Sequence, residues 1–170
     1  MLISLLLMLS GVALLGFRYF QQVIKREPEH NLDIITDENG QMELVWESSY
    51  ESGNKGIDSQ HKKLFVDGNK LISAIYGNQS ETDIEALLDS LIDDIETHFV
   101  SEEAVLKKRG FEDYDNHKNI HQELLDEAYT LRKEVKNGEL DYVDVVNFFI
   151  YDLILNHILD EDQRYFTVVK

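Results

Sequence analysis

The sequence contains no cysteine and one proline among its 170 residues. Without cysteine there are no disulfides, thiolate zinc sites or cysteine-ligated iron–sulfur clusters, so any metal must be held by nitrogen and oxygen atoms. A single proline, Pro28, and only nine glycines disfavour loop-rich and all-β architectures and favour long helices. The length is that of one ordinary domain that buries its own core.

Basic residues are also scarce in this chain. Thirty-three acidic side chains stand against 16 basic ones, which gives a formal net charge of −17. Such a surface repels the phosphate backbone of DNA and RNA, so we expect no nucleic-acid partner.

The one long hydrophobic run lies at the N-terminus. Residues 1–17 contain only apolar residues, two serines and two glycines, which is the short end of what crosses a bilayer as a helix. Basic residues follow it, and the positive-inside rule then places the remainder of the chain in the cytoplasm. We therefore expect a hydrophobic helix over 1–26 that contacts the membrane through 1–20 and anchors a cytoplasm-facing protein to the inner membrane. A helix that caps the folded domain or self-associates, in a soluble cytoplasmic protein, is the alternative.

Residues 27–43 are polar and acidic and contain the turn pair Asn39-Gly40, so we interpret them as a linker. Residues 44–170 hold four stretches with apolar residues at helical spacing, and turn signals end the first three. The stretches cover about residues 58–76, 82–108, 114–136 and 142–162. Short connections between helices of this length predict an all-α fold, an up-down-up-down antiparallel four-helix bundle preceded by the N-terminal hydrophobic helix.

Five of the six histidines fall in these helical stretches, and three stretches pair a histidine with a second potential ligand. His98 precedes Glu102 by four residues, His117 precedes His121 by four, and His157 precedes Asp162 by five. A spacing of four places both side chains on one helix face, one turn apart. Five residues rotate Asp162 well away from His157 in an α-helix, so Asp162 has to reach in from the end of its helix.

Any one of these residues, taken alone, is most often an ordinary helix-surface group. Together they lie beside apolar core positions, where neutral imidazoles need partners and a metal is the economical one. With His61 they total five imidazoles and two carboxylates, which is more than one tetrahedral zinc uses. Two metals are implied, and the donor types favour iron over manganese or zinc. The Glu-x-x-His pairs of ferritin-like proteins are missing from the four stretches, and a set poor in carboxylates favours oxygen binding over oxidation chemistry.

Several longer motifs surround these candidate ligands and cover nearly all of residues 44–170. They are Trp46-x-x-x-Tyr50-x-x-Gly53, Gly56 to His61, His98 to Glu103, Tyr114 to His121, and Asn156-His157-Ile158-x-x-x-Asp162 with Tyr165. In order and spacing they resemble the hemerythrin family, and in particular its single-domain bacterial members. The resemblance implies that residues 44–170 form a hemerythrin-like bundle around a non-haem di-iron centre.

The resemblance also implies a role for each candidate ligand. The implied metal ligands are His61, His98, Glu102, His117, His121, His157 and Asp162. The last three histidines would bind one iron, whereas His61 and His98 would bind the other and leave a position open for oxygen. Glu102 and Asp162 would bridge the two irons together with an oxo or hydroxo group. The ions, cycling between Fe2+ and Fe3+, would hold dioxygen reversibly as hydroperoxide.

The resemblance makes Ile158 and Leu159 candidates for the wall of an oxygen pocket. Leu153 departs from the family pattern, in which an aromatic residue is frequent one turn before the histidine of the fourth helix. His30, in the acidic linker, is expected to take no part in the site.

The leading interpretation is an oxygen-binding protein, a carrier, store or supplier of dioxygen, and not an enzyme. One alternative is a di-iron redox enzyme that reduces peroxide or nitric oxide or oxidises iron, which would need a general acid or an electron-entry partner near the open iron. The other is an oxygen or redox sensor, which would usually carry an output domain that these 170 residues do not contain.

Overall fold

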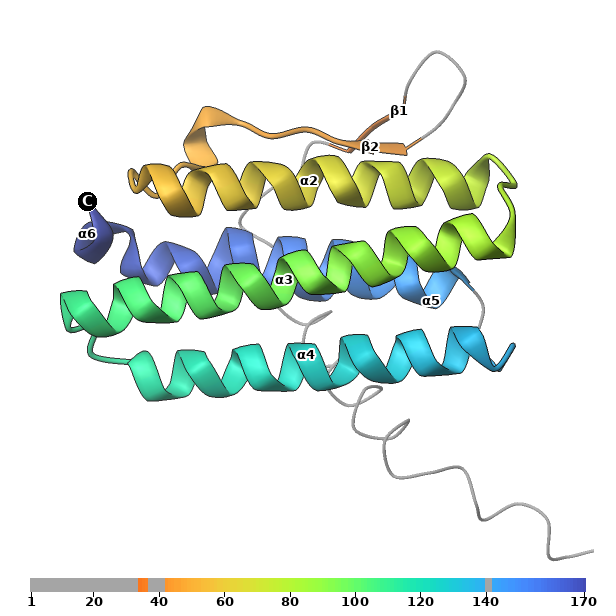
Figure 1. Cartoon of the computed structure of the whole chain (residues 1–170). Helices are drawn as coiled ribbons and strands as arrows, with labels where there is room; N and C mark the ends of the chain where they lie inside the picture. The colour runs from red at the N-terminus through yellow and green to blue at the C-terminus, as the bar shows by residue number, and fades with distance from the viewer. Residues whose placement is uncertain (1–33, 37–41, 140–141) are drawn as a thin grey trace, which may run out of the picture. The chain divides into compact units, whose positions relative to one another are not determined.

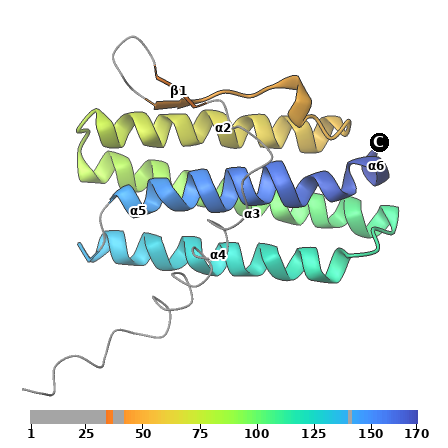
Figure 2. The same ribbon diagram turned by 180° about the vertical axis from the view of Figure 1, so that it is seen from behind.

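The computed structural model describes residues 34–36, 42–139 and 142–170. Four long helical segments lie side by side and alternate in direction (Figure 1). They are α2 (Lys55–Tyr76), α3 (Glu81–Arg109), α4 (Tyr114–Lys136) and a fourth segment formed by α5 (Tyr142–Asn147) and η2 (Phe148–Glu161). Seen from behind, the fourth segment runs alongside the others and continues through η3 (Asp162–Tyr165) to α6 (Phe166–Val169) (Figure 2). The predicted all-α up-down-up-down four-helix bundle is confirmed.

The ends of the long helices follow from local capping chemistry. The side chain of Asn54 accepts hydrogen bonds from the backbone N–H groups of Gly56 and Ile57, which starts α2 three residues before the predicted position. Ser80 caps α3 in the same way through the N–H of Asp83. Gly110 ends α3 in the left-handed region at φ 71°, where a residue without a Cβ is favoured.

The fourth segment differs from its prediction as one α-helix over 142–162. Only its first part, α5, is α-helical, and η2 is a π-helix, in which each backbone N–H donates to the carbonyl five residues earlier. The apolar spacing predicted the position of this segment but not its wider turn, because aliphatic side chains cover most of its surface whichever pattern the backbone adopts.

A short antiparallel hairpin lies within the stretch that we predicted to be a linker. Strands β1 (Ile34–Thr36) and β2 (Met42–Leu44) pair with Ile34 opposite Leu44. The side chain of Asn69 on α2 holds the hairpin, because its amide donates to the carbonyl of Leu44 at 2.9 Å and accepts from the N–H of Leu44 at 2.8 Å. The hairpin was not predicted from the sequence, although the Asn39-Gly40 turn pair, which lies outside the described residues, comes between its two strands.

The predicted N-terminal hydrophobic helix over 1–26 also lies outside the described residues. Among the helices of the described ranges, none combines the length and the apolar character that a membrane span requires.

Apolar side chains from all four helical segments form one core. Within it, Gly68 on α2 lies so close to Phe149 on η2 that an added Cβ would be 1.9 Å from the phenyl ring. Helices approach this closely only where one of them carries no side chain, so Gly68 sets the distance between α2 and η2.

We predict that Gly68→Ala destabilises the protein by about 1–3 kcal/mol, because the new methyl group must displace Phe149 in a packed core. Denaturant unfolding of the metal-free protein measures the change. Ser73→Ala, at an exposed position of the same helix, is the control and should stay within about 0.5 kcal/mol. Equal stability of the two variants would show that the approach of the helices is not tight.

Candidate metal centre

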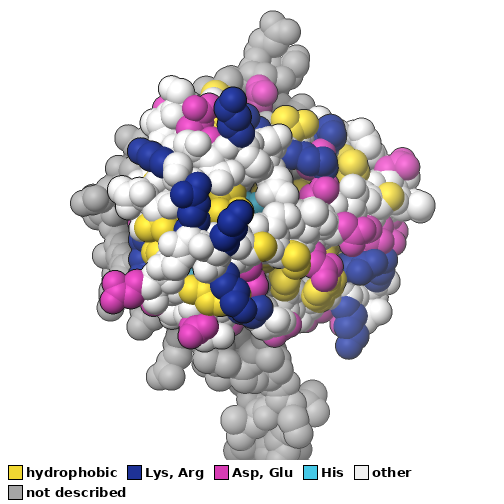
Figure 3. Space-filling model, turned by 60° about the vertical axis from the view of Figure 1, so that its left-hand side comes forward, with side chains coloured by type: hydrophobic (Ala, Val, Ile, Leu, Met, Phe, Trp, Pro, Cys, Tyr) yellow, Lys and Arg dark blue, Asp and Glu magenta, His cyan; other side chains and the backbone are white. Residues whose placement is uncertain are grey.

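All four helical segments contribute candidate ligands to one buried site. His61 lies on α2, His98 and Glu102 on α3, His117 and His121 on α4, His157 on η2, and Asp162 at the start of η3. Each of these seven side chains is at most 1 % exposed. On the face drawn in Figure 3, histidine surface is visible only in traces between hydrophobic and basic side chains.

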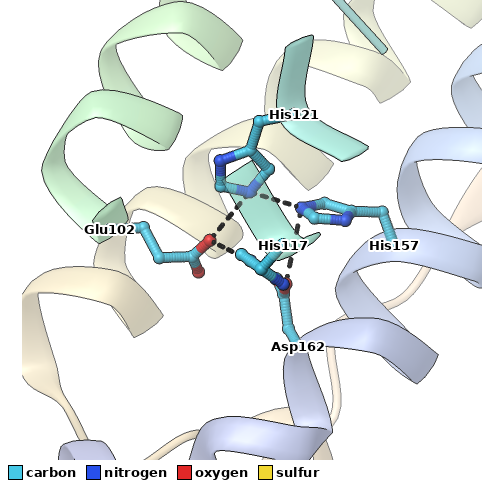
Figure 4. Close-up of side chains that lie close together, drawn as sticks. All are labelled: Glu102, His117, His121, His157 and Asp162. Carbon is cyan, nitrogen blue, oxygen red and sulfur yellow. Dashed lines mark hydrogen bonds and ion pairs between the residues drawn. The ribbon is translucent and has the colours of Figure 1, made fainter. Parts of the chain in front are cut away.

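The seven side chains form two groups that share members. One group contains Glu102, His117, His121, His157 and Asp162, and the other contains His61, His98, Glu102 and Asp162, with the potential ligand atoms of each group within 4.8 Å of one another. Figure 4 shows the first group, in which the imidazoles and the carboxylates point toward one another. Both carboxylates belong to both groups, so they lie between the two sets of histidines.

The same ring nitrogen, Nε2, faces the centre in all five histidines. The Nε2 atoms of His61 and His98 are 3.0 Å apart, and so are those of His121 and His157. The Nε2 atom of His117 lies 3.0 Å from Oε2 of Glu102. Five converging Nε2 atoms leave the Nδ1 atoms on the outside, which is the orientation of imidazoles that share a metal centre.

The wide turn of η2 explains how Asp162 reaches this centre. An α-helix would rotate residues five apart by about 140°, so Asp162 would point away from His157. In the structure the backbone N–H of Asp162 donates to the carbonyl of His157 across five residues. This π-type bond brings Oδ1 of Asp162 to 3.4 Å from Nε2 of His157. Asp162 therefore reaches the centre, as the sequence required, because the helix that carries His157 is of the π type and not of the α type.

Burial keeps three of the five imidazoles neutral. It lowers the pKa of His98 to about 3, lowers that of His157 well below its ordinary value, and also lowers that of His61. These three rings are therefore uncharged at physiological pH. A neutral imidazole whose outer nitrogen carries the proton offers the lone pair of Nε2 to a metal ion.

The two shared carboxylates have opposite pKa shifts. Burial and repulsion from Glu102 raise the pKa of Asp162 well above its ordinary value. Burial opposes ionisation of Glu102 as well, but the surrounding imidazoles, including His117 and His121, outweigh it and lower its pKa. Two buried carboxylates this close cannot both ionise cheaply, and a cation between them would remove the repulsion.

Unsatisfied polar atoms give an independent test of whether a metal fits. Within the described residues, neither carboxylate oxygen of Asp162 accepts a hydrogen bond, although it is completely buried. Imidazole Nε2 atoms of His61 and His117 lie 3.2 and 3.5 Å from these oxygens. Buried polar groups are nearly always paired, and lone pairs that face one another become favourable only around a cation. The residues present therefore fit a pair of metal ions held by nitrogen and oxygen.

Comparison with known proteins agrees with this geometry. The family model described as the hemerythrin HHE cation binding domain matches residues 52–169. The chain belongs to the hemerythrin family. A bacteriohemerythrin of Methylococcus capsulatus is 36 % identical over 124 residues, which cover 72 % of this chain and 93 % of that protein. A hemerythrin-like protein of Naegleria gruberi is 34 % identical over 71 % of this chain and 88 % of its own length.

Solved hemerythrin structures share the fold. A crystal structure of wild-type hemerythrin aligns with a TM-score of 0.66 at 31 % identity, over 74 % of this chain and 97 % of that one. The resemblance to the hemerythrin family that the motifs indicated is thus confirmed.

Three polar side chains that contact the candidate ligands were not predicted as site residues, although they lie in the hemerythrin-like motifs. The buried hydroxyl of Tyr165 donates to Oε1 of Glu102. Oε1 of Gln60 lies 3.3 Å from Nδ1 of His98, and Oε1 of Glu103 lies 3.2 Å from Nδ1 of His121. Adjacency to a ligand in the sequence was the available signal for Gln60 and Glu103. Tyr165 follows Asp162 by three residues, which is one turn of the 3-10 helix η3, so both side chains lie on the same side of that helix.

The two residues predicted to line an oxygen pocket are buried. Ile158 and Leu159 are each 1 % exposed and belong to the main core. Within the described residues, neither borders the small apolar cavity between Leu71, Leu91 and Phe149. Their role as a pocket wall stays a prediction. His30 lies outside the described residues.

We predict that Tyr165→Phe destabilises the metal-free protein by about 1.5–3 kcal/mol, because a buried hydroxyl that donates to a carboxylate is lost. The free energy of unfolding in denaturant measures this change. Tyr151→Phe is the matched control, since Tyr151 is 46 % exposed. A loss no larger than that of the control would mean that Tyr165 does not hold Glu102 in place.

Proposed function

We propose that the protein binds dioxygen reversibly at a non-haem di-iron centre held by the seven converging side chains. The observation that carries the proposal is that Glu102 and Asp162 belong to two donor groups of unequal size. Shared carboxylates are what two bridged metals require, and imidazole-rich sites of this kind suit iron. Membership of a family whose relatives are named hemerythrin and bacteriohemerythrin supports the choice of iron and of oxygen.

Two iron ions held by these side chains would supply the two electrons that dioxygen takes up on binding and would recover them when it leaves. The group of His61 and His98 has one imidazole fewer than the other group. We therefore place the open position, where oxygen binds, on the side of these two histidines. His117, His121 and His157 would fill the remaining positions of the second ion, so that this ion is not available to oxygen.

The protein around the ligands keeps water and protons away from the centre. Phe99 is fully buried and stacks on the ring of His121, with 3.8 Å between ring centroids. Ile158 and Leu159 adjoin His157 in the sequence and are equally buried, and we propose them as part of the apolar wall. Exclusion of water suppresses side reactions of bound oxygen, which is what a reversible carrier needs.

A binding role fits the site better than catalysis. The five imidazoles and two carboxylates of the donor groups make a set poor in carboxylates, which favours oxygen binding over oxidation chemistry. A redox enzyme would need a proton donor placed at the open position. A redox enzyme and an oxygen sensor remain the alternatives that the experiment below separates from a carrier.

The test is a metal count and an optical spectrum of the full-length protein through anaerobic reduction and return to air. We expect two irons per chain and a visible band that forms with oxygen and disappears under vacuum. Oxidation to a ferric state without that reversible band would leave a di-iron centre but refute the carrier, and would direct work to the enzyme and the sensor.

We predict that His98→Ala abolishes the oxygen-dependent band and lowers the iron content, because it removes one of only two histidines on the open side. His30→Ala, which removes the one histidine outside the four helical stretches, should leave both unchanged. Iron analysis and the same optical cycle measure the two variants side by side. Equal behaviour of the variants would refute the ligand assignment.

We also propose a layout for the whole chain, with a membrane-anchoring helix over 1–26, an acidic segment over 27–43 that contains β1 and the start of β2, and the di-iron domain over 44–170. The apolar residues 1–17 and the basic residues that follow them support the anchor. We predict that the full-length protein sediments with membranes, whereas a variant lacking residues 2–26 stays in the supernatant with the same spectrum. Full-length protein found in the supernatant would refute the anchor.

A further inference from the structure

Two of the five ligand histidines have a polar partner behind the ring. Nδ1 of His98 lies 3.3 Å from the side-chain oxygen of Gln60, and Nδ1 of His121 lies 3.2 Å from a carboxylate oxygen of Glu103. The Nδ1 atoms of the other three histidines have no hydrogen-bond partner within the described ranges. When Nε2 of such a ring binds an ion, the ring proton is on Nδ1, and Nδ1 then donates to these oxygens.

The two partners are placed alike but on different sides of the centre. Gln60 adjoins His61 on α2 and reaches across to His98 on α3. Glu103 adjoins Glu102 on α3 and reaches across to a histidine on α4. Each proposed iron therefore has one histidine whose ring is hydrogen-bonded from behind. Gln60 contacts His98 at the iron with the open position, and Glu103 contacts His121 at the iron bound by three histidines.

The two partners differ in charge, which makes the two sides chemically unequal. Glu103 is an acid whose other oxygen pairs with Nζ of Lys118 at 2.8 Å, and its side chain is 16 % exposed. A carboxylate draws the Nδ1 proton of His121 more strongly than a neutral amide does, and so makes Nε2 of that ring a stronger donor. The amide of Gln60 orients His98 without adding negative charge.

We propose that Glu103 and Gln60 are positioning residues that make the two ion sites unequal. The ion bound by His117, His121 and His157 is held more tightly and is oxidised more readily, whereas the ion bound by His61 and His98 keeps its ferrous state more easily. This inference rests on the proposed di-iron function and adds to it an order between the two ions. Oxygen thus meets an open-side ion that resists oxidation while no oxygen is bound.

The first experiment titrates full-length, metal-free protein with Co2+ alone and follows the absorption of the bound ions. Wild-type protein should show two unequal affinities. Glu103→Gln should weaken the tighter site about 10–100-fold, as is typical when the partner of a ligand histidine is removed. Gln60→Glu should tighten the weaker site, because His98 then gains a charged partner.

The second experiment measures the reduction potential of the iron-loaded protein, which a purely structural role of Glu103 would leave unchanged. Loss of the negative charge favours the ferrous state, so Glu103→Gln should raise the potential and Gln60→Glu should lower it. A tenfold change in the preference for ferric over ferrous iron corresponds to about 59 mV for one electron.

Two further variants separate the hydrogen bond from charge alone. Glu96 lies on the same helix as Glu103, and its carboxylate accepts a hydrogen bond from Tyr129 at the surface. Glu96→Gln removes this carboxylate and should change neither the Co2+ affinity nor the reduction potential. Glu103→Asp keeps the charge but shortens the side chain, so it should weaken Co2+ binding. Wild-type affinity and potential in Glu103→Asp would overturn the inference, because charge at a distance would then suffice.

The outcomes also separate this inference from the proposed function. Suppose that the wild-type protein binds two ions and that Glu103→Gln has the same affinities and the same reduction potential. This result would overturn the inference and leave the di-iron centre intact. A wild-type protein that binds no pair of ions would overturn both. If Glu103→Gln fails to fold, as judged by its circular dichroism, Gln60→Glu and Glu103→Asp still decide the question.

Discussion

Seven buried polar side chains from all four helical segments face one another inside the bundle, and the rotation of each long helix depends on them. Each of the four helical segments supplies at least one donor, so its rotation about its own axis is fixed by where that donor must point. Apolar packing alone tolerates more than one arrangement of such helices. A misplaced histidine or carboxylate would instead bury an unsatisfied polar group, which costs several kcal/mol.

The same requirement accounts for the backbone of the fourth segment. In α3 and α4 the paired ligands are four residues apart and the helices are of the α type, so both members of a pair face the centre. His157 on η2 and Asp162 at the start of η3 are five residues apart, and the backbone hydrogen bond between them spans the same five residues. Helix type and ligand spacing therefore agree throughout the site. π-Helical turns are rare and are frequently found at functional sites.

Much of this site could be predicted because α-helical periodicity is a local property. The pairs His98 with Glu102 and His117 with His121 follow from counting residues, and so do the two α-helices that carry them. The π-helix could not be predicted, since its apolar pattern also suits an α-helix. Gln60, Glu103 and Tyr165 act across helices, and such contacts depend on how the helices pack. The hairpin was missed for the same reason, because Asn69 holds it from α2.

The position of Asp162 in the chain has a consequence for how the centre is assembled during synthesis. Asp162 belongs to both donor groups, and it follows the other six candidate ligands in chain order. A nascent chain that has formed only α2, α3 and α4 carries five of the seven donors but completes neither group. Neither donor group is complete until the last helical segment has docked, because Asp162 closes both of them. An ion could therefore meet its full set of protein donors only after the whole bundle has formed.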